Sequence, residues 1–331
     1  TYTVTVVSDS GNKYRFDGFG TSAVTLDLAE GGTYIFDQSD SSNAGHPLRF
    51  YTAADKTGGE YTTGVTTAGT PGSSGAYTQI VVPASAPTLF YQCSAHAGMG
   101  GQINTNSTLG SSNFDGTIQT TAKVNASAGF SVVRWVGNGS SGATIGHGLG
   151  VAPKAVFVKR RDGSSNWISP FFDLQTAGKL NLSDAFTNSY YNTFFTSQPT
   201  SSVITIGSND DINRNTYIFS EVSSYSKFGT YTGNGNSDGV FVFLNFRPAL
   251  VIIKKSDGGN SWTIMDNKRD IDNPTGLQLF ANLSDADYSA TGLDFISNGF
   301  KCRNSATEIN ASGGTYVYLA FAESPFKNAR A

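Results

Sequence analysis

The sequence predicts an all-β chain, and three observations carry that prediction. Gly makes up 38 of the 331 residues and Ser, Thr and Asn recur throughout, a composition typical of short strands joined by tight turns. Charged residues are only 14 % of the chain, so we expect a surface rich in hydroxyl and amide groups. Apolar and polar residues alternate over short stretches such as 2–7. The length favours two or three domains.

The first part of the chain reads as a series of short strands separated by turn signals. The expected strands are residues 2–7, 33–36, 48–51, 79–82 and 89–92. From residue 104 to residue 125 the sequence becomes polar and Gly-rich, with too few apolar residues to make a core of its own. We therefore predict a first domain over residues 1–105 and a linker over residues 106–128.

An internal duplication follows the linker. The triplet at 137–139 returns at 233–235, and Trp167 returns as Trp262, at offsets of 96 and 95 residues. The duplication predicts two tandem β-sandwich repeats, the first over residues 129–230 and the second over residues 231–331. Two copies are too few for a solenoid, so either each repeat has its own core or the two share one.

Four residues with metal-binding side chains come from two segments of the first domain. Cys93, His96 and Met99 follow an expected strand with the spacing C-x-x-H-x-x-M, and His46 precedes another strand. Two imidazoles, one thiolate and a weak thioether are the donor set of a blue-copper site. The sequence therefore predicts a copper site at these four residues. The alternative is a metal-free loop that is kept for its turn geometry.

The C-x-x-H-x-x-M loop, together with Asn43 three residues before His46, resembles the cupredoxins. It is similar to the loop of amicyanin and close to that of plastocyanin. The resemblance implies a cupredoxin-like Greek-key sandwich over residues 1–105, with the two histidines and the cysteine as equatorial ligands, Met99 as the axial ligand and Asn43 in support. A long polar insertion at residues 53–76 departs from the family pattern.

Several separated motifs of the C-terminal half resemble a module of marine-phage (cyanophage-type) tail-fibre and appendage proteins. The motifs are residues 145–153, 225–229, 233–235, 246–249 and 320–327. The resemblance implies a non-enzymatic structural or adhesion protein of a bacteriophage virion, as a tail fibre, appendage or capsid decoration. It also implies a place on the virion surface or outside the cell, other virion proteins as partners, a homo-oligomer, and host recognition through surface glycans.

Two functions of other classes stay open. The ligand set alone fits a secreted blue-copper electron-transfer protein. Aromatic residues at or near matched repeat positions fit a carbohydrate-binding module, although such residues more often fill duplicate cores. These aromatics are Trp135, Trp167, Trp262, Tyr217 and Tyr316.

Composition argues against two kinds of partner. The net charge is -3 and Lys and Arg are scattered, so we expect no nucleic-acid partner. No run of 18 apolar residues is present, so we expect no membrane span.

Two further patterns predict turns rather than sites. His147 lies between glycines, and we expect it to be a partly exposed turn residue. Asp266, Asp270, Asp272 and Asn273 crowd oxygen donors as calcium loops do, but basic residues interrupt them, which favours a solvated turn.

Overall fold

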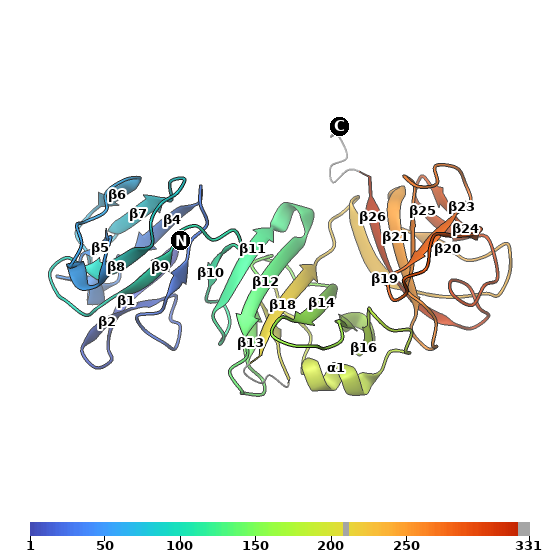
Figure 1. The fold of residues 1–331 in the computed structure, drawn as a ribbon, viewed down its shortest axis with the longest axis horizontal. Helices are drawn as coiled ribbons and strands as arrows, with labels where there is room; N and C mark the ends of the chain where they lie inside the picture. The colour runs from blue at the N-terminus through green and yellow to red at the C-terminus, as the bar shows by residue number, and fades with distance from the viewer. Residues whose placement is uncertain (208–211, 324–331) are drawn as a thin grey trace. The chain divides into compact units, whose positions relative to one another are not determined.

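The computed structural model describes residues 1–207 and 212–323 and is all-β, which confirms the predicted fold class (Figure 1). Among these residues one α-helix is present, α1 (Asn188–Phe194). The chain divides into two compact units. The first comprises residues 1–123, 133–135 and 144–148, and the second comprises 124–132, 136–143 and 149–331. The last motif of the C-terminal half, residues 320–327, lies partly outside the described residues.

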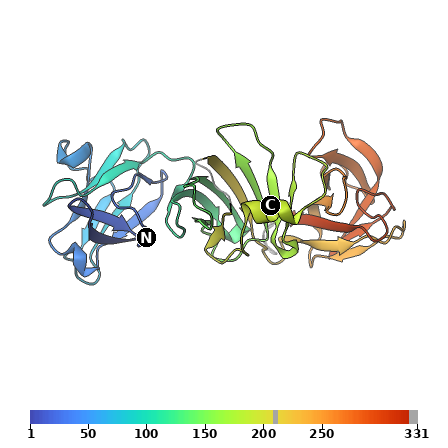
Figure 2. The same cartoon turned by 90° about the horizontal axis from the view of Figure 1, so that it is seen from below.

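The first unit is a sandwich of two sheets, drawn from blue to green in Figures 1 and 2. One sheet has the order β2-β1-β4-β7-β6 and the other the order β3-β9-β8-β5. The first sheet consists of β1 (Tyr2–Ser8), β2 (Asn12–Phe16), β4 (Thr33–Asp37), β6 (Val65–Ala68) and β7 (Tyr77–Val81). The second consists of β3 (Leu26–Asp27), β5 (Leu48–Tyr51), β8 (Leu89–Cys93) and β9 (Gly101–Asn104). Two short turns, η1 (Ser41–Asn43) and η2 (Ala54–Lys56), flank β5.

Aromatic side chains from both sheets fill the core of the first unit. Phe16 and Tyr91 meet edge to face with ring centroids 5.0 Å apart. Residues 106–128, predicted as a linker, carry β10 (Ser111–Asn113) and β11 (Thr120–Asn125). They also contribute Phe114, which is buried and lies 5.3 Å from the ring of Phe19. Part of this polar segment therefore completes the core of the first unit instead of forming its own. One further strand, β13 (Thr144–Gly146), belongs to this unit.

The second unit contains a four-stranded group and an eight-stranded sheet. In the first group β14 (Ala155–Arg160) pairs with β18 (Asn213–Phe219) and with β15 (Ile168–Phe171), which pairs with β16 (Thr176–Lys179). The larger sheet, yellow to red in Figure 1, has the order β19-β26-β21-β22-β23-β24-β25-β20. Its strands are β19 (Ser226–Thr232), β20 (Phe241–Phe243), β21 (Pro248–Lys255), β22 (Thr263–Asp266), β23 (Thr275–Phe280), β24 (Tyr288–Ile296), β25 (Gly299–Cys302) and β26 (Thr315–Ala322). The unit also contains β17 (Val203–Thr205), η3 (Ala126–Ala128) and η4 (Phe172–Leu174), whereas β12 (Phe130–Val136) is divided between the two units.

The two repeats share one core, and the second repeat has another of its own. Phe157 and Phe186 of the first repeat pack in one buried cluster with Trp262 and Leu319 of the second. A separate cluster around Phe295 and its neighbours lies within the larger sheet. The sequence left open whether each repeat has its own core or the two share one. The structure contains one shared core and one core that belongs to the second repeat alone. Within the described residues, no helix has the length and apolar character needed to cross a membrane.

Candidate metal centre

Strand register brings His46 to the end of β8. β5 and β8 are antiparallel with Leu48 opposite Cys93. The amide of Ser94 donates to the carbonyl of Pro47 at 2.9 Å, which continues the pairing beyond the strand ends. Continued by two residues, the register sets His46 opposite the residue before His96. Two segments almost fifty residues apart therefore meet because their strands pair, as a shared site requires.

The three predicted equatorial ligands form a compact cluster. The Sγ atom of Cys93 lies 3.8 Å from Nδ1 of His46 and 3.6 Å from Nδ1 of His96. All three ligand atoms lie within 4.8 Å of one another. With a metal–sulfur bond of about 2.3 Å and metal–nitrogen bonds of about 2.0 Å, trigonal or tetrahedral angles separate sulfur from nitrogen by about 3.5–3.7 Å. The observed spacings therefore fit one shared metal ion.

The three predicted equatorial ligands differ in how far they are exposed to solvent. Cys93 is fully buried, His46 is half-buried and His96 is exposed. Burial lowers the pKa of the His46 imidazole, and the nearby His96 lowers it further. The neutral imidazole is the form that binds a metal. The backbone amide of His96 donates to the Cys93 sulfur at 3.4 Å, which holds the turn between the two residues.

Buried polar groups hold the turn that carries His46. The carbonyl of His46 accepts hydrogen bonds from the hydroxyl of Tyr14 at 2.8 Å and from Nε2 of Gln38 at 2.9 Å. Asn43 is fully buried, donates to the carbonyl of Val4 at 2.7 Å, and accepts from the His46 amide through its own carbonyl at 2.8 Å. These partners fix the backbone at the ligand, as groups around a metal site commonly do. No spacing in the sequence singles out Tyr14 or Gln38; they are found only from the fold.

Met99 and the glycine after it close the ligand loop. Met99 is 1 % exposed and belongs to the same core cluster as Cys93, and its carbonyl accepts from the amide of Tyr14 at 2.9 Å. A Cβ atom on Gly100 would lie 1.6 Å from the carbonyl oxygen of Tyr91, so only glycine fits there. The close approach returns the chain to β9 directly after the loop. The role of Met99 as a fourth ligand stays a prediction.

The second cysteine has a different environment. Cys302 is fully buried in the larger sheet of the second unit, where its sulfur lies 3.7 Å from the carbonyl oxygen of Ile309. Burial raises the pKa of this thiol to about 12. A thiol in such surroundings stays protonated and unreactive. Cys302 therefore serves as a natural control for Cys93.

Two expectations about the repeats need correction or refinement. His147 is fully buried, so the predicted partly exposed turn histidine is wrong; the glycines around it allow a close-packed bend, not an exposed one. Trp135, Trp262 and Tyr316 are buried and offer no ring face for stacking on sugars. The other two aromatics singled out in the sequence, at 167 and 217, are partly exposed and pack on each other with centroids 5.8 Å apart.

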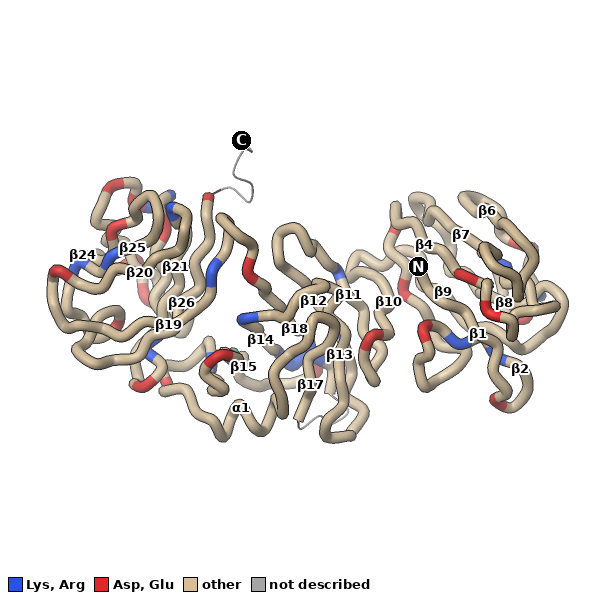
Figure 3. Tube along the Cα trace, turned by 180° about the vertical axis from the view of Figure 1, so that it is seen from behind, with Lys and Arg blue, Asp and Glu red and all other residues tan. Residues whose placement is uncertain are grey.

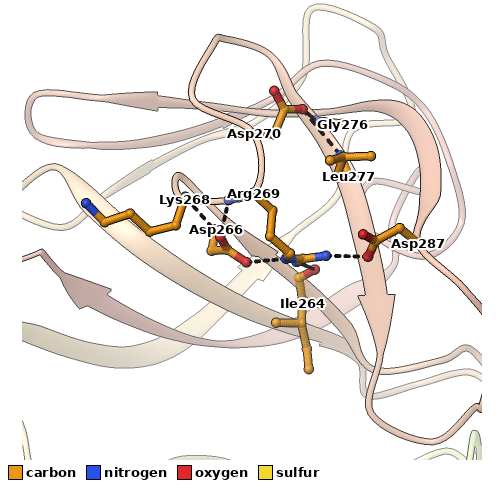
Figure 4. Close-up of polar contacts among 8 residues, drawn as sticks. All are labelled: Ile264, Asp266, Lys268, Arg269, Asp270, Gly276, Leu277 and Asp287. Atoms are coloured by element: carbon orange, nitrogen blue, oxygen red, sulfur yellow. Dashed lines mark hydrogen bonds and ion pairs between the residues drawn. The ribbon is translucent and has the colours of Figure 1, made fainter.

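The acidic segment after β22 is a hydrogen-bonded turn (Figure 4). One carboxylate oxygen of Asp266 accepts from the amides of Lys268 and Arg269, and the other accepts from Nε of Arg269 at 2.6 Å. Burial acts to raise the pKa of Asp266, but these hydrogen bonds outweigh it and lower the pKa. Asp270 accepts from the amide of Gly276 at 2.6 Å. Because these oxygens are occupied by the chain itself, a turn explains the cluster better than a calcium loop does.

Basic and acidic residues lie mixed on each unit (Figure 3). Several form exposed ion pairs, such as Lys154 with Asp173 at 3.0 Å. Exposed pairs of this kind contribute little to stability. The mixture of both signs agrees with the small net charge of -3.

A cavity of about 340 Å³ lies in the second unit beside helix α1. Its wall combines two stacked aromatic rings of the helix, Tyr190 and Phe194, with polar groups that include Asn166 and Arg160. Apolar walls with a few convergent polar groups are typical of small-molecule sites. No motif in the sequence pointed to it, because its lining comes from four separate segments.

Comparison with known proteins adds one finding. A family model described as a domain of unknown function, DUF7483, matches residues 104–325. No curated protein and no solved structure matches the chain. The matched span covers the first repeat and the second as far as residue 325, and it begins after Met99, so the candidate metal centre lies outside it.

Proposed function

The chain belongs to the DUF7483 family, and we propose that it is a non-catalytic structural protein whose first unit binds a copper ion. The ligands are His46, Cys93 and His96, with Met99 as the weak fourth ligand. The observation that carries this proposal is the spacing of 3.6 and 3.8 Å between one cysteine sulfur and two imidazole nitrogens. Soft sulfur combined with imidazole favours copper, and it is the donor set expected from the cupredoxin resemblance.

The residues around the ion have separable roles in this proposal. Cys93 supplies the sulfur ligand from the end of a buried strand, and the amide of His96 donates a hydrogen bond to that sulfur. The backbone of His46 is held through its carbonyl, and Nε2 of its ring lies 3.4 Å from Nδ2 of Asn12. A bound copper ion would supply one-electron redox chemistry at this position.

Titration of the full chain with Cu(II) tests the proposal. We expect one equivalent of copper to bind and to produce intense visible absorption from the thiolate-to-copper interaction. The substitution Cys93→Ser should abolish that absorption, because a hydroxyl replaces the thiolate. Cys302→Ala is the matched control and should leave it unchanged, since Cys302 is buried in the other unit.

Three outcomes would overturn copper binding at this site. Copper-loaded protein could stay colourless, the absorption could persist in the Cys93→Ser variant, or zinc could bind in place of copper when both are offered. Circular dichroism of each variant shows whether the fold is retained, so that loss of colour reports on the ligand.

We propose as a second function that the repeats act as an adhesion module of a phage virion, with a glycan as the ligand. The resemblance of the repeats to marine-phage appendage proteins suggests the setting. The specific observation in favour of a glycan is the cavity beside α1, whose lining includes the aromatic residues Tyr190 and Phe194 together with amide and guanidinium side chains. Such a combination suits a sugar, which has apolar ring faces and polar edges.

A glycan array probed with the full chain tests this second function. We expect binding to at least one class of surface glycan, and we expect Phe194→Ala to weaken it about tenfold or more by removing a stacking face. Tyr288→Ala is the control, because Tyr288 is 57 % exposed and does not line the cavity. An array without hits, or equal loss in both variants, would count against a glycan site there.

A further inference from the structure

Two consecutive residues of the polar insertion adopt a backbone conformation that side chains disfavour. Asp55 has φ 50° and Lys56 has φ 64°, both in the left-handed region. A non-glycine residue in this region is strained and persists only where surrounding contacts hold it. Both residues belong to η2, which follows β5 and lies in the insertion that departs from the cupredoxin pattern. The contacts of these two side chains therefore hold the turn in this conformation.

The strained turn contacts the ligand loop at two points. Oδ1 of Asp55 accepts a hydrogen bond from the amide of Gly98 at 2.6 Å. Nζ of Lys56 donates to the carbonyl of Ser94 at 3.1 Å. Gly98 and Ser94 lie on either side of His96, so the turn holds the loop on both sides of a ligand. An ordinary right-handed conformation at Asp55 and Lys56 would direct these side chains elsewhere.

Two further residues fix the same loop. Gln92, the residue before Cys93, donates to the carbonyl of His96 at 3.0 Å and to Oδ1 of Asp55 at 3.2 Å. Oε1 of the same Gln92 side chain accepts from the amide of Gly100 at 2.7 Å. The ammonium of Lys13 donates to the carbonyl of Gly98. The Gly98 residue is thus held through its amide by a carboxylate and through its carbonyl by an ammonium.

We propose that Asp55 is a positioning residue of the metal centre, and this inference rests on the proposed copper binding. Gly98 stands between His96 and Met99, so anchoring its amide sets how far the thioether lies from the other three ligands. The strength of the axial thioether tunes a copper centre of this type. Asp55 contacts no ligand side chain itself; it acts through the loop backbone and through Gln92.

Two substitutions separate the hydrogen bond from the backbone strain. In Asp55→Asn the amide oxygen still accepts from the Gly98 amide, and Asn tolerates the left-handed region. In Asp55→Gly the acceptor is lost while the backbone conformation becomes easy to adopt. Asp17→Asn is the control, because Asp17 is also exposed and also accepts one backbone amide, that of Thr3 at 2.7 Å, without contacting the ligand loop.

The readouts are the Cu(II) affinity, the visible spectrum of the copper form and amide hydrogen exchange of the metal-free full chain. We expect Asp55→Gly to speed exchange at Gly98, to weaken copper binding about tenfold and to shift the absorption band, without a lower melting temperature. Asp55→Asn and Asp17→Asn should match the unsubstituted protein. A merely structural residue would lower the melting temperature in Asp55→Gly and leave the band unmoved.

The possible results distinguish the positioning role of Asp55 from the proposed copper binding. Wild-type affinity and spectrum in Asp55→Gly, or unchanged Gly98 exchange, would overturn the role of Asp55 while leaving copper binding intact. A parent protein that binds no copper would overturn the proposed function, and the positioning role would fall with it.

Discussion

Replacing Trp262 with alanine is expected to lower the free energy of unfolding of the second unit by about 3–5 kcal/mol. Trp262 is fully buried in the cluster that the two repeats share. Its ring lies 5.7 Å from that of Phe186 and 6.4 Å from that of Phe157. Its indole nitrogen donates to the carbonyl of Lys179 at 2.9 Å. The substitution therefore removes a large apolar side chain, leaves a cavity and removes one of the hydrogen bonds to the Lys179 carbonyl, which also accepts from the amide of Leu182 at 3.2 Å.

The duplication supplies the control for this prediction. Trp167 occupies the matching position of the first repeat but is only partly buried, so Trp167→Ala should cost about 1–2 kcal/mol. Urea unfolding followed by circular dichroism measures both changes. An equal loss in free energy of unfolding in the two variants would contradict the different burial of the two tryptophans.

A second large effect is expected from Lys254, whose side chain is fully buried in β21. Burial lowers its pKa to about 8; the charge of Lys255 also lowers it, while Asp184 and Asp257 act in the opposite direction. The ammonium donates to the carbonyls of Lys255 and Gly258 and lies 5.9 Å from the ring centroid of Phe186. Folding therefore places a charge where water does not reach it.

The sign of the pH effect follows from this lowered pKa. The ordinary pKa is 10.5, so between about pH 8 and pH 10.5 the unfolded chain binds more protons than the folded chain, and stability rises with pH. At about 1.4 kcal/mol per pKa unit, the rise approaches 3 kcal/mol. We expect Lys254→Met to abolish this contribution, whereas Lys159→Met, at the matching position of the first repeat, keeps it. The measurement is the free energy of unfolding of each protein from pH 7 to pH 10.5. The same pH dependence in the parent and in Lys254→Met would contradict the role of Lys254.

Composition and alternation were sufficient to predict the fold class, because both depend on local preferences. Three of the proposed ligands could also be predicted from the sequence, because C-x-x-H-x-x-M is a local pattern. What brings His46 to them is the register of Leu48 against Cys93, which depends on pairing between distant strands. For the same reason Asp55 could not be predicted: it lies in a polar insertion, and its importance comes from a contact with Gly98, 43 residues further along the chain.

Burial was the property that local patterns predicted least well. Phe114 is the one aromatic residue of the polar segment 106–128, and nothing in that segment indicates that its ring enters the core of the first unit. His147 and Trp135 belong to glycine-rich or strand-like stretches whose neighbours in space come from elsewhere in the chain, and both are buried. Residues of this kind are assigned correctly only when the packing of distant segments is known.

Elemental analysis of the full chain, after incubation with copper and zinc and removal of unbound metal, tests the central claim most directly. The account predicts one copper per chain in the parent protein and in Cys302→Ala, and none in Cys93→Ser. Zinc in place of copper, no bound metal, or copper that remains after Cys93 is replaced would contradict it.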